Sequence, residues 1–182
     1  MADRNLAPAP LDLVEEFVNS VELSPDGDQD AIATPEELDA WLAGQGFPGA
    51  RSTEADVERA RIVREGLRGL LEENNGHPAG PQDAGELDRA LSGTELRIRF
   101  QDGAVRLVAA PGLDAFLAAL SDAMLCSQAD GTWSNLKACR AETCRWAFYD
   151  RSRNHSGVWC SMDDCGSREK VRAYRRRKAA AS

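Results

Sequence analysis

The sequence predicts an α+β protein: a mainly helical N-terminal domain with one β-hairpin, followed by a small C-terminal module rich in cysteine. Apolar residues recur at helical spacing through most of the first 130 residues, and one segment near residue 100 alternates at strand spacing. Four of the five cysteines fall within residues 139–165. We therefore expect two units, residues 1–130 and residues 131–182, with the boundary at Asp130-Gly131.

Five helices are expected in the first unit, because each segment has an amphipathic stripe, a capping signal or both. Three asparagines (Asn19, Asn74 and Asn75) fall in expected caps and turns, where asparagine needs no ligand. The expected helices are Leu11–Val18, a helix capped by Thr34-Pro35-Glu36-Glu37 that runs to about Gly44, a long helix from Ser52 or Thr53 to Asn74-Asn75-Gly76, a short helix between Pro81 and Gly93, and a helix from Pro111 through Met124.

A β-hairpin is expected between the last two of these helices. Leu96, Ile98 and Phe100 alternate with arginines, Gln101-Asp102-Gly103 interrupts the pattern, and Val105 and Leu107 resume it. The remaining cysteine, Cys126, lies on the apolar side of the helix that follows. We expect it to be a small core residue and not a metal ligand.

The distribution of charge divides the chain into the same two parts as the helical and cysteine patterns. The net charge is −8, but residues 137–178 hold 12 basic and 5 acidic residues, a net charge of +7, which leaves −15 on the rest. An acidic body with a basic end indicates a carrier domain joined to a module that binds an anionic partner. No run approaches the ~18 apolar residues of a membrane span, and the N-terminus has no signal-peptide pattern, so we expect a cytoplasmic protein without a membrane partner.

The cysteines form the pattern Cys139-x4-Cys144-x15-Cys160-x4-Cys165. In a reducing cytosol, two such pairs favour metal ligation, and four thiolates close the shell of one structural Zn²⁺. A module of this size has too small a hydrophobic core to fold without a stabilising metal ion. Four thiolates and one zinc ion would lower the charge of the module by two, to +5, which still attracts phosphates.

Four alternatives to this zinc site remain at the level of sequence. The cysteines could form two disulfides or be unrelated buried thiols, and an iron–sulfur cluster also takes four thiolates. His155 could replace one thiolate, although it lies in the turn Asn154-His155-Ser156-Gly157. Zinc-bound thiolates can also be oxidised, so a redox switch is a further possibility.

A basic helix is expected after Cys165, and with it the module is similar to a treble-clef zinc finger. Arg168, Arg172, Arg175 and Arg176 share one side of this helix, and Val171 and Tyr174 are expected to face the metal core. Because arginine can bridge two acceptors on guanine or phosphate, we expect these four side chains to contact nucleic acid. The supporting phosphate contacts are expected from Arg151, Arg153 and Lys170.

The module resembles the CGNR-type zinc fingers of bacteria. The resemblance rests on Cys144-Arg145-Trp146-Ala147-Phe148-Tyr149-Asp150-Arg151-Ser152-Arg153-Asn154, on Trp159-Cys160-Ser161-Met162, and on the tetrad Cys165-Gly166-Ser167-Arg168, in which Ser167 replaces asparagine. The body resembles the ABATE domain through three segments. These are Phe17-Val18-Asn19-Ser20, Ala33-Thr34-Pro35-Glu36-Glu37-Leu38-Asp39-Ala40-Trp41-Leu42 and Arg64-Glu65-Gly66-Leu67-Arg68-Gly69-Leu70-Leu71.

These resemblances imply a stress-responsive transcription regulator, with duplex DNA bound by the finger and a sensory or assembly role for the body. The alternative is a zinc-stabilised adaptor whose basic helix binds an acidic protein. No catalytic constellation is visible, so we do not expect an enzyme. The predicted partners are duplex DNA, a second copy of the chain, because one finger offers little contact area, and a small-molecule or protein effector of the body.

Overall fold

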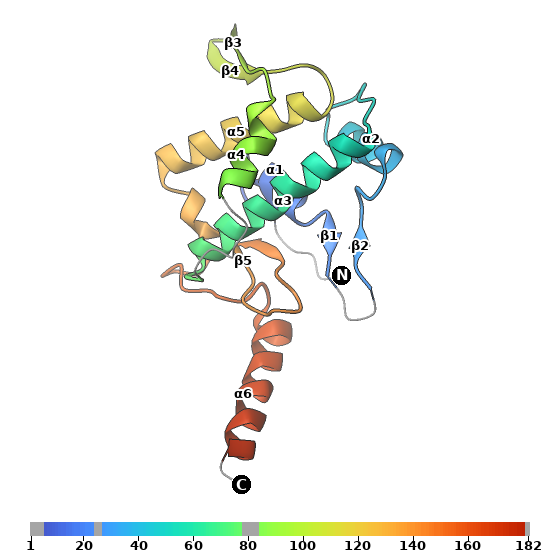
Figure 1. The fold of residues 1–182 in the computed structure, drawn as a ribbon. Helices are drawn as coiled ribbons and strands as arrows, with labels where there is room; N and C mark the ends of the chain where they lie inside the picture. The colour runs from blue at the N-terminus through green and yellow to red at the C-terminus, as the bar shows by residue number, and fades with distance from the viewer. Residues whose placement is uncertain (1–5, 24–26, 78–83, 181–182) are drawn as a thin grey trace.

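The computed structural model describes residues 6–23, 27–77 and 84–180 (Figure 1). The helices in these ranges are α1 (Leu11–Val18), α2 (Pro35–Gly44), α3 (Glu54–Asn74), α4 (Ala84–Ser92), α5 (Leu113–Asp130) and α6 (Ser167–Ala180). The strands form three antiparallel pairs: β1 (Val21–Glu22) with β2 (Gln29–Asp30), β3 (Arg97–Gln101) with β4 (Ala104–Val108), and β5 (Leu136–Ala138) with β6 (Ala147–Tyr149). The predicted α+β class is therefore confirmed.

The predicted capping signals begin two of the helices. Thr34 accepts a hydrogen bond from the backbone of Glu37, whose carboxylate accepts one from the backbone of Thr34, and Thr53 forms the same reciprocal pair with Asp56. Each pair satisfies two backbone N–H groups that the helix cannot bond internally. The helix predicted between Pro81 and Gly93 is α4, but residues 81–83 lie outside the described part of the chain.

Aromatic side chains from four segments form the centre of the core. The ring of Phe116 on α5 lies 4.9 Å from that of Phe17 on α1, 5.2 Å from Trp41 on α2 and 5.4 Å from Phe47, in edge-to-face contacts. Such contacts between rings add to the free energy gained by burying the rings. Together with the apolar side of α3, they hold the body by hydrophobic packing.

The C-terminal module is built onto this core. Leu136 and Ala138 of β5 and Ala147 of β6 are buried in the same apolar cluster as α1, α3 and α5. The boundary expected at Asp130-Gly131 coincides with the end of α5, which Gly131 closes in the left-handed conformation, at φ +79°. This position ends a helix, but the apolar core continues across it.

Two arginines of α3 are buried within the stripe that the sequence suggests is apolar. Arg68 is fully buried and donates to the backbone oxygens of Val18 at 2.6 Å and Arg145 at 2.8 Å. Arg64 is 4% exposed and pairs with Asp30 of β2. Because both charges are hydrogen-bonded and paired, their burial is tolerated. The small β1–β2 pair, which the sequence pattern does not predict, supplies one of these partners.

The prediction that Cys126 is a core residue is wrong, because Cys126 lies on the exposed side of α5. The buried position is taken by its neighbour Ser127, whose hydroxyl donates to the backbone of Met124. A hydroxyl that forms a hydrogen bond can be buried at little cost, which a prediction from hydrophobicity alone misses.

Among the described helices, none combines the length and apolar character needed to cross a membrane.

Candidate metal centre and basic helix

The first cysteine pair lies in the turn between β5 and β6. Cys139 directly follows β5 and donates its backbone N–H to Trp146, while the N–H groups of Cys144 and Arg145 both bond to the carbonyl of Ala141. Arg145 has a positive φ of 48°, which tightens the chain behind Cys144. The strand pairing and the left-handed residue together bring the two sulfurs to the same side of the turn.

The second pair lies where a short π-helical turn (Met162–Gly166) leads into α6. Ser161 caps this turn by accepting a hydrogen bond from Asp164, and Cys165 is fully buried at its end. A side chain at Gly166 would come within 3.1 Å of both Trp159 and Met162, so only glycine fits there without displacing them. Ser167, which replaces the asparagine of the CGNR tetrad, donates its hydroxyl to the carbonyl of Met162 at 3.1 Å.

The four sulfurs of Cys139, Cys144, Cys160 and Cys165 all lie within 4.8 Å of one another. The distance from Cys144 to Cys160 is 3.6 Å and that from Cys160 to Cys165 is 3.8 Å. A tetrahedron with Zn–S bonds of about 2.3 Å has edges of about 3.8 Å, whereas a disulfide joins its sulfurs at about 2 Å. The donor set therefore fits one structural zinc ion, and no disulfide joins any of the five cysteines.

Arg168 lies against the metal site. Its guanidinium donates to the sulfur of Cys165 at 3.2 Å and pairs with Asp164 at 3.2 Å. A donor on a thiolate stabilises its negative charge, as partners around metal ligands commonly do. This arginine, the last residue of the tetrad, is thus held by the module itself. His155 lies apart from the four sulfurs, with its ring nitrogen Nδ1 3.0 Å from the backbone oxygen of Asp150.

A buried ion pair organises the segment between the two cysteine pairs. Lys137 donates to Asp150 at 2.7 Å and to the carbonyl of His155 at 2.6 Å, and the side chains of this pair are only 6% and 3% exposed. Burial alone would raise the pKa of Asp150, but hydrogen bonds from Lys137, Ser152 and Gly157 hold this pKa at about 2. The sequence pattern gives no sign of this pair.

Asn75 at the end of α3 joins the body to the metal module. Its side-chain amide donates to the carbonyls of Ala138, beside the first cysteine, and Val158, near the third, at 2.7 and 3.0 Å. In return, Arg140 donates to the backbone oxygen of Asn75 at 2.8 Å. One side chain of the body thus holds both halves of the module.

Asn74 also donates to the backbone oxygens of Trp133 and Leu136 at 3.0 and 2.9 Å, and Asn19 and Arg145 add further contacts to this junction. Asn19 at the end of α1 both donates to and accepts from the backbone of Ala147, at 2.9 and 2.8 Å, as a neighbouring strand would. Arg145 forms an ion pair with Glu72 of α3 at 2.7 Å. The asparagines expected only as cap and turn residues therefore also bind the module, because each cap lies against it.

The predicted basic helix α6 extends from the module away from the rest of the molecule (Figure 1). The prediction that Val171 and Tyr174 face the metal core is wrong, because they are 49% and 62% exposed. The side chains packed around the buried cysteines are instead those of Trp159, Phe148 and Ala141. Arg172 pairs with Glu169 at 2.7 Å. Within the described residues, no ion pair involves Lys170, Arg175, Arg176 or Arg177.

The remaining predicted contact residues lie in the loop after β6. Arg151 is exposed, lies 5.2 Å from the ring centre of Tyr149, and donates to the backbone oxygen of Leu6. Arg153 is exposed in the following turn. Both belong to this loop and not to α6, so the predicted contact residues that share one element are those of the helix: Arg168, Lys170, Arg172, Arg175 and Arg176.

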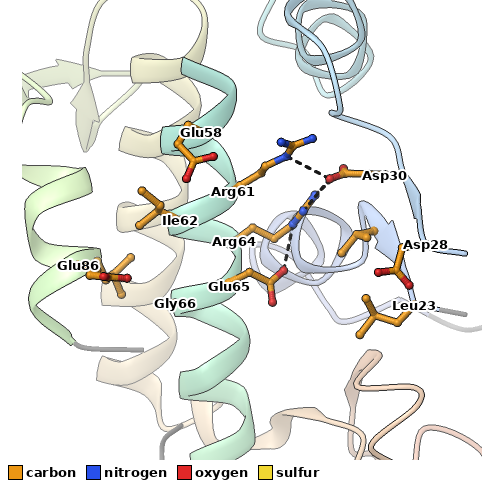
Figure 2. Close-up of a pocket in the computed structure, with 12 residues that line it drawn as sticks. Leu23, Asp28, Asp30, Glu58, Arg61, Ile62, Arg64, Glu65, Gly66 and Glu86 are labelled. Atoms are coloured by element: carbon orange, nitrogen blue, oxygen red, sulfur yellow. Dashed lines mark hydrogen bonds and ion pairs between the residues drawn. The ribbon is translucent and has the colours of Figure 1, made fainter. Parts of the chain in front are cut away.

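The body contains a pocket of about 410 Å³ between α3, α4 and β2. Figure 2 shows Arg61 and Arg64 pointing from α3 toward Asp30, with Glu58 and Glu86 farther along the pocket. Both arginines bind Asp30, Arg64 through two hydrogen bonds of 2.7 and 2.9 Å. These guanidinium groups are therefore engaged within the protein.

The fold and the site together define a two-part protein: a helical domain joined to a small zinc finger in which four cysteines can hold the metal ion. Family comparisons identify both parts: residues 135–178 match the CGNR zinc finger, and residues 11–130 match ABATE, described as "Putative stress-induced transcription regulator". The chain belongs to the ABATE family and carries a CGNR zinc finger at its C-terminal end. No curated protein matches the chain.

Proposed function

We propose that this protein is a stress-responsive transcription regulator that binds duplex DNA through α6 and its finger. The observation that carries the proposal is the positive charge of Arg175, Arg176 and Arg177, which form no ion pair with any residue that the structure describes, on a helix that extends away from an acidic body (Figure 1). Such guanidinium groups at an exposed end can replace the counterions of phosphates without first breaking an ion pair. The DNA assignment rests on this charge and on the family.

The four predicted arginines differ in what they can contribute. Arg175 and Arg176 are available to contact phosphate or base edges, and Arg172 must first exchange Glu169 for its new partner. Arg168 remains on the Cys165 thiolate and orients the start of the helix. Lys170 on the opposite side of α6, with Arg151 and Arg153 beside the module, supplies the weaker phosphate contacts.

The test replaces Arg175 and Arg176 together by alanine and measures binding to duplex DNA over a salt series. We expect weaker binding and a log–log salt slope reduced by about two units, one for each phosphate that the variant no longer neutralises. The control is Arg51→Ala with Arg89→Ala, which removes the same charge from exposed positions on the body. An equal decrease in affinity in both double variants would mean that net charge, and not α6, determines the affinity.

A zinc-stabilised adaptor is the second candidate, and one observation favours it. Val171 and Tyr174 leave an apolar surface beside the arginines of α6, as in helices that bind a partner protein. If the wild-type chain does not retard duplex DNA at moderate salt, the adaptor becomes the better interpretation.

A further inference from the structure

The hairpin β3–β4 has two chemically different faces. Its register places Phe100 opposite Val105 and Ile98 opposite Leu107, so these four side chains share one face, which Leu96 extends. The other face carries three arginines: Arg97, Arg99 and Arg106. The turn at Asp102 and Gly103, both with positive φ, fixes this register.

The apolar face is open to solvent. Arg106 on the other face pairs with Asp122 of α5 at 3.7 Å, but Arg97 and Arg106 are themselves 69% and 57% exposed, so both faces of the hairpin reach solvent. On the apolar face, Phe100 is 86% exposed, Ile98 65% and Val105 55%. Phe100 is thus the most exposed of the large hydrophobic side chains that the structure describes.

We propose that this apolar face is the interface of a homodimer, in which the hairpins of two copies pack face to face. The exposed parts of Leu96, Ile98, Phe100 and Val105 amount to on the order of 500 Å² per chain, since a large apolar side chain carries about 200 Å². Two copies would bury about 1,000 Å², the area that a specific interface should reach.

A second copy fits this face better than an anionic partner does. Among the described strand residues of the hairpin, none with a charged side chain lies on this face, so a twofold contact between two such faces buries no unpaired charge. The arginines remain on the outer sides of the paired hairpins. The body behind them is acidic, and it repels an anionic phospholipid surface or a nucleic acid more strongly than a second chain of net charge −8, because those partners carry a far higher density of negative charge.

The decisive experiment is sedimentation velocity of the zinc-loaded full chain over a hundredfold range of concentration. We expect a monomer–dimer equilibrium that reaches twice the monomer mass of 19.8 kDa. Phe100→Asp and, separately, Val105→Asp should each raise the dissociation constant at least tenfold, with unchanged circular dichroism and zinc content. The matched control is Val171→Asp, which alters a valine of similar exposure at the other end of the molecule.

Two results would overturn the proposal. One is a wild-type chain that stays monomeric throughout, including a monomer that binds phospholipid vesicles through Phe100. The other is a dimer that both hairpin variants leave intact, which would place the interface elsewhere.

A consequence for DNA follows, and it rests on the proposed function. The hairpin and α6 lie at opposite ends of the molecule (Figure 1), so a hairpin dimer whose two bodies lie on opposite sides of the paired hairpins presents its two basic helices facing away from each other. Such a dimer would bridge two duplexes instead of reading adjacent half-sites. We expect wild-type protein on an immobilised duplex to capture a second, labelled duplex, and Phe100→Asp to bind one duplex without capturing another.

The two experiments fail separately. If the chain binds no DNA, the proposed function fails while the sedimentation result still decides the interface. If the dimer forms and each duplex binds but no second duplex is captured, the opposed arrangement of the helices is wrong.

Discussion

The body and the metal module reach stability by different routes. The body packs an aromatic cluster around Phe116 among its helices, whereas the module has only a few apolar side chains and depends on four thiolates and the Lys137–Asp150 pair. Hydrophobic packing is spread over many contacts, but a metal centre concentrates its free energy in four bonds. Losses of stability in the module should therefore be abrupt and those in the body gradual.

Removal of zinc should have the largest effect. Structural zinc sites contribute roughly 10 to 16 kcal/mol, so chelation should unfold the module, with helicity of α1 to α5 largely retained. The melting temperature of the body should also fall, because Leu136, Ala138 and Ala147 leave the shared core. Circular dichroism and metal analysis measure both effects. Cys126→Ser is the control and should keep full zinc content; loss of zinc in this variant would contradict the four-cysteine assignment.

The second effect in size concerns the buried ion pair. Lys137→Met leaves the carboxylate of Asp150 buried without its cation, which should cost about 3 to 5 kcal/mol. Zinc release should accelerate, because the segment between the cysteine pairs loses its anchor. Arg153→Met, an exposed change in the same segment, is the control. Equal zinc-release rates in the two variants would show that the pair does not support the metal site.

Sequence reasoning could predict the parts of this protein that depend on local patterns. Capping boxes at Thr34 and Thr53 define helix starts, and paired cysteine spacing identifies a metal site, because both are read within a few residues. Lys137, Asp150, Asn75 and the buried arginines of α3 could not be found this way. Their partners lie at sequence separations of 13 to 83 residues, so only the folded chain reveals them.

The same reasoning explains two errors. Val171 and Tyr174 have the helical spacing of a packed face, yet the module already fills its core with other rings. Cys126 belongs to a helix that is apolar on nearly all sides, so periodicity does not identify its buried positions. A pattern predicts that a face is apolar, but not whether another surface covers it.

The junction between the two regions gives a third prediction. Asn75→Leu removes the side-chain donor to the buried carbonyl of Ala138, which should cost about 1 to 3 kcal/mol, and also the donor to the carbonyl of Val158, which keeps its hydrogen bond from the backbone of Arg140 at 3.1 Å and should add less. Zinc affinity and body stability should fall together, because the residue touches both. Asn135→Leu, whose amide lies 3.4 Å from the hydroxyl of Tyr149 within the module, is the comparison. If Asn75→Leu lowers only one of the two quantities, the regions are not coupled through this residue.

The smallest predicted effect is a pH dependence of folding stability that is caused by one residue of the body. Glu15 of α1 is buried, and burial raises its pKa to about 6, although Ala7 and Arg151 oppose the shift. The folded state keeps this proton in a range where the unfolded chain, with a pKa of 4.5, has lost it, so folding stability falls as pH rises from 4.5 to about 6. Glu15→Gln should stabilise the protein by about 1 to 2 kcal/mol at pH 7 and by less than about 0.5 kcal/mol at pH 4.5.

Urea unfolding of Glu15→Gln and wild type at both pH values measures this difference, and protonation of the zinc thiolates cancels because it is common to both proteins. Glu22→Gln on the exposed side of β1 is the control and should change stability at neither pH. A gain at pH 7 that persists unchanged at pH 4.5 would mean that the glutamine packs better, and that the charge of Glu15 is not what costs the body its stability. A gain that disappears at low pH would show that the body contains an ionisable group, Glu15, whose charged form opposes folding.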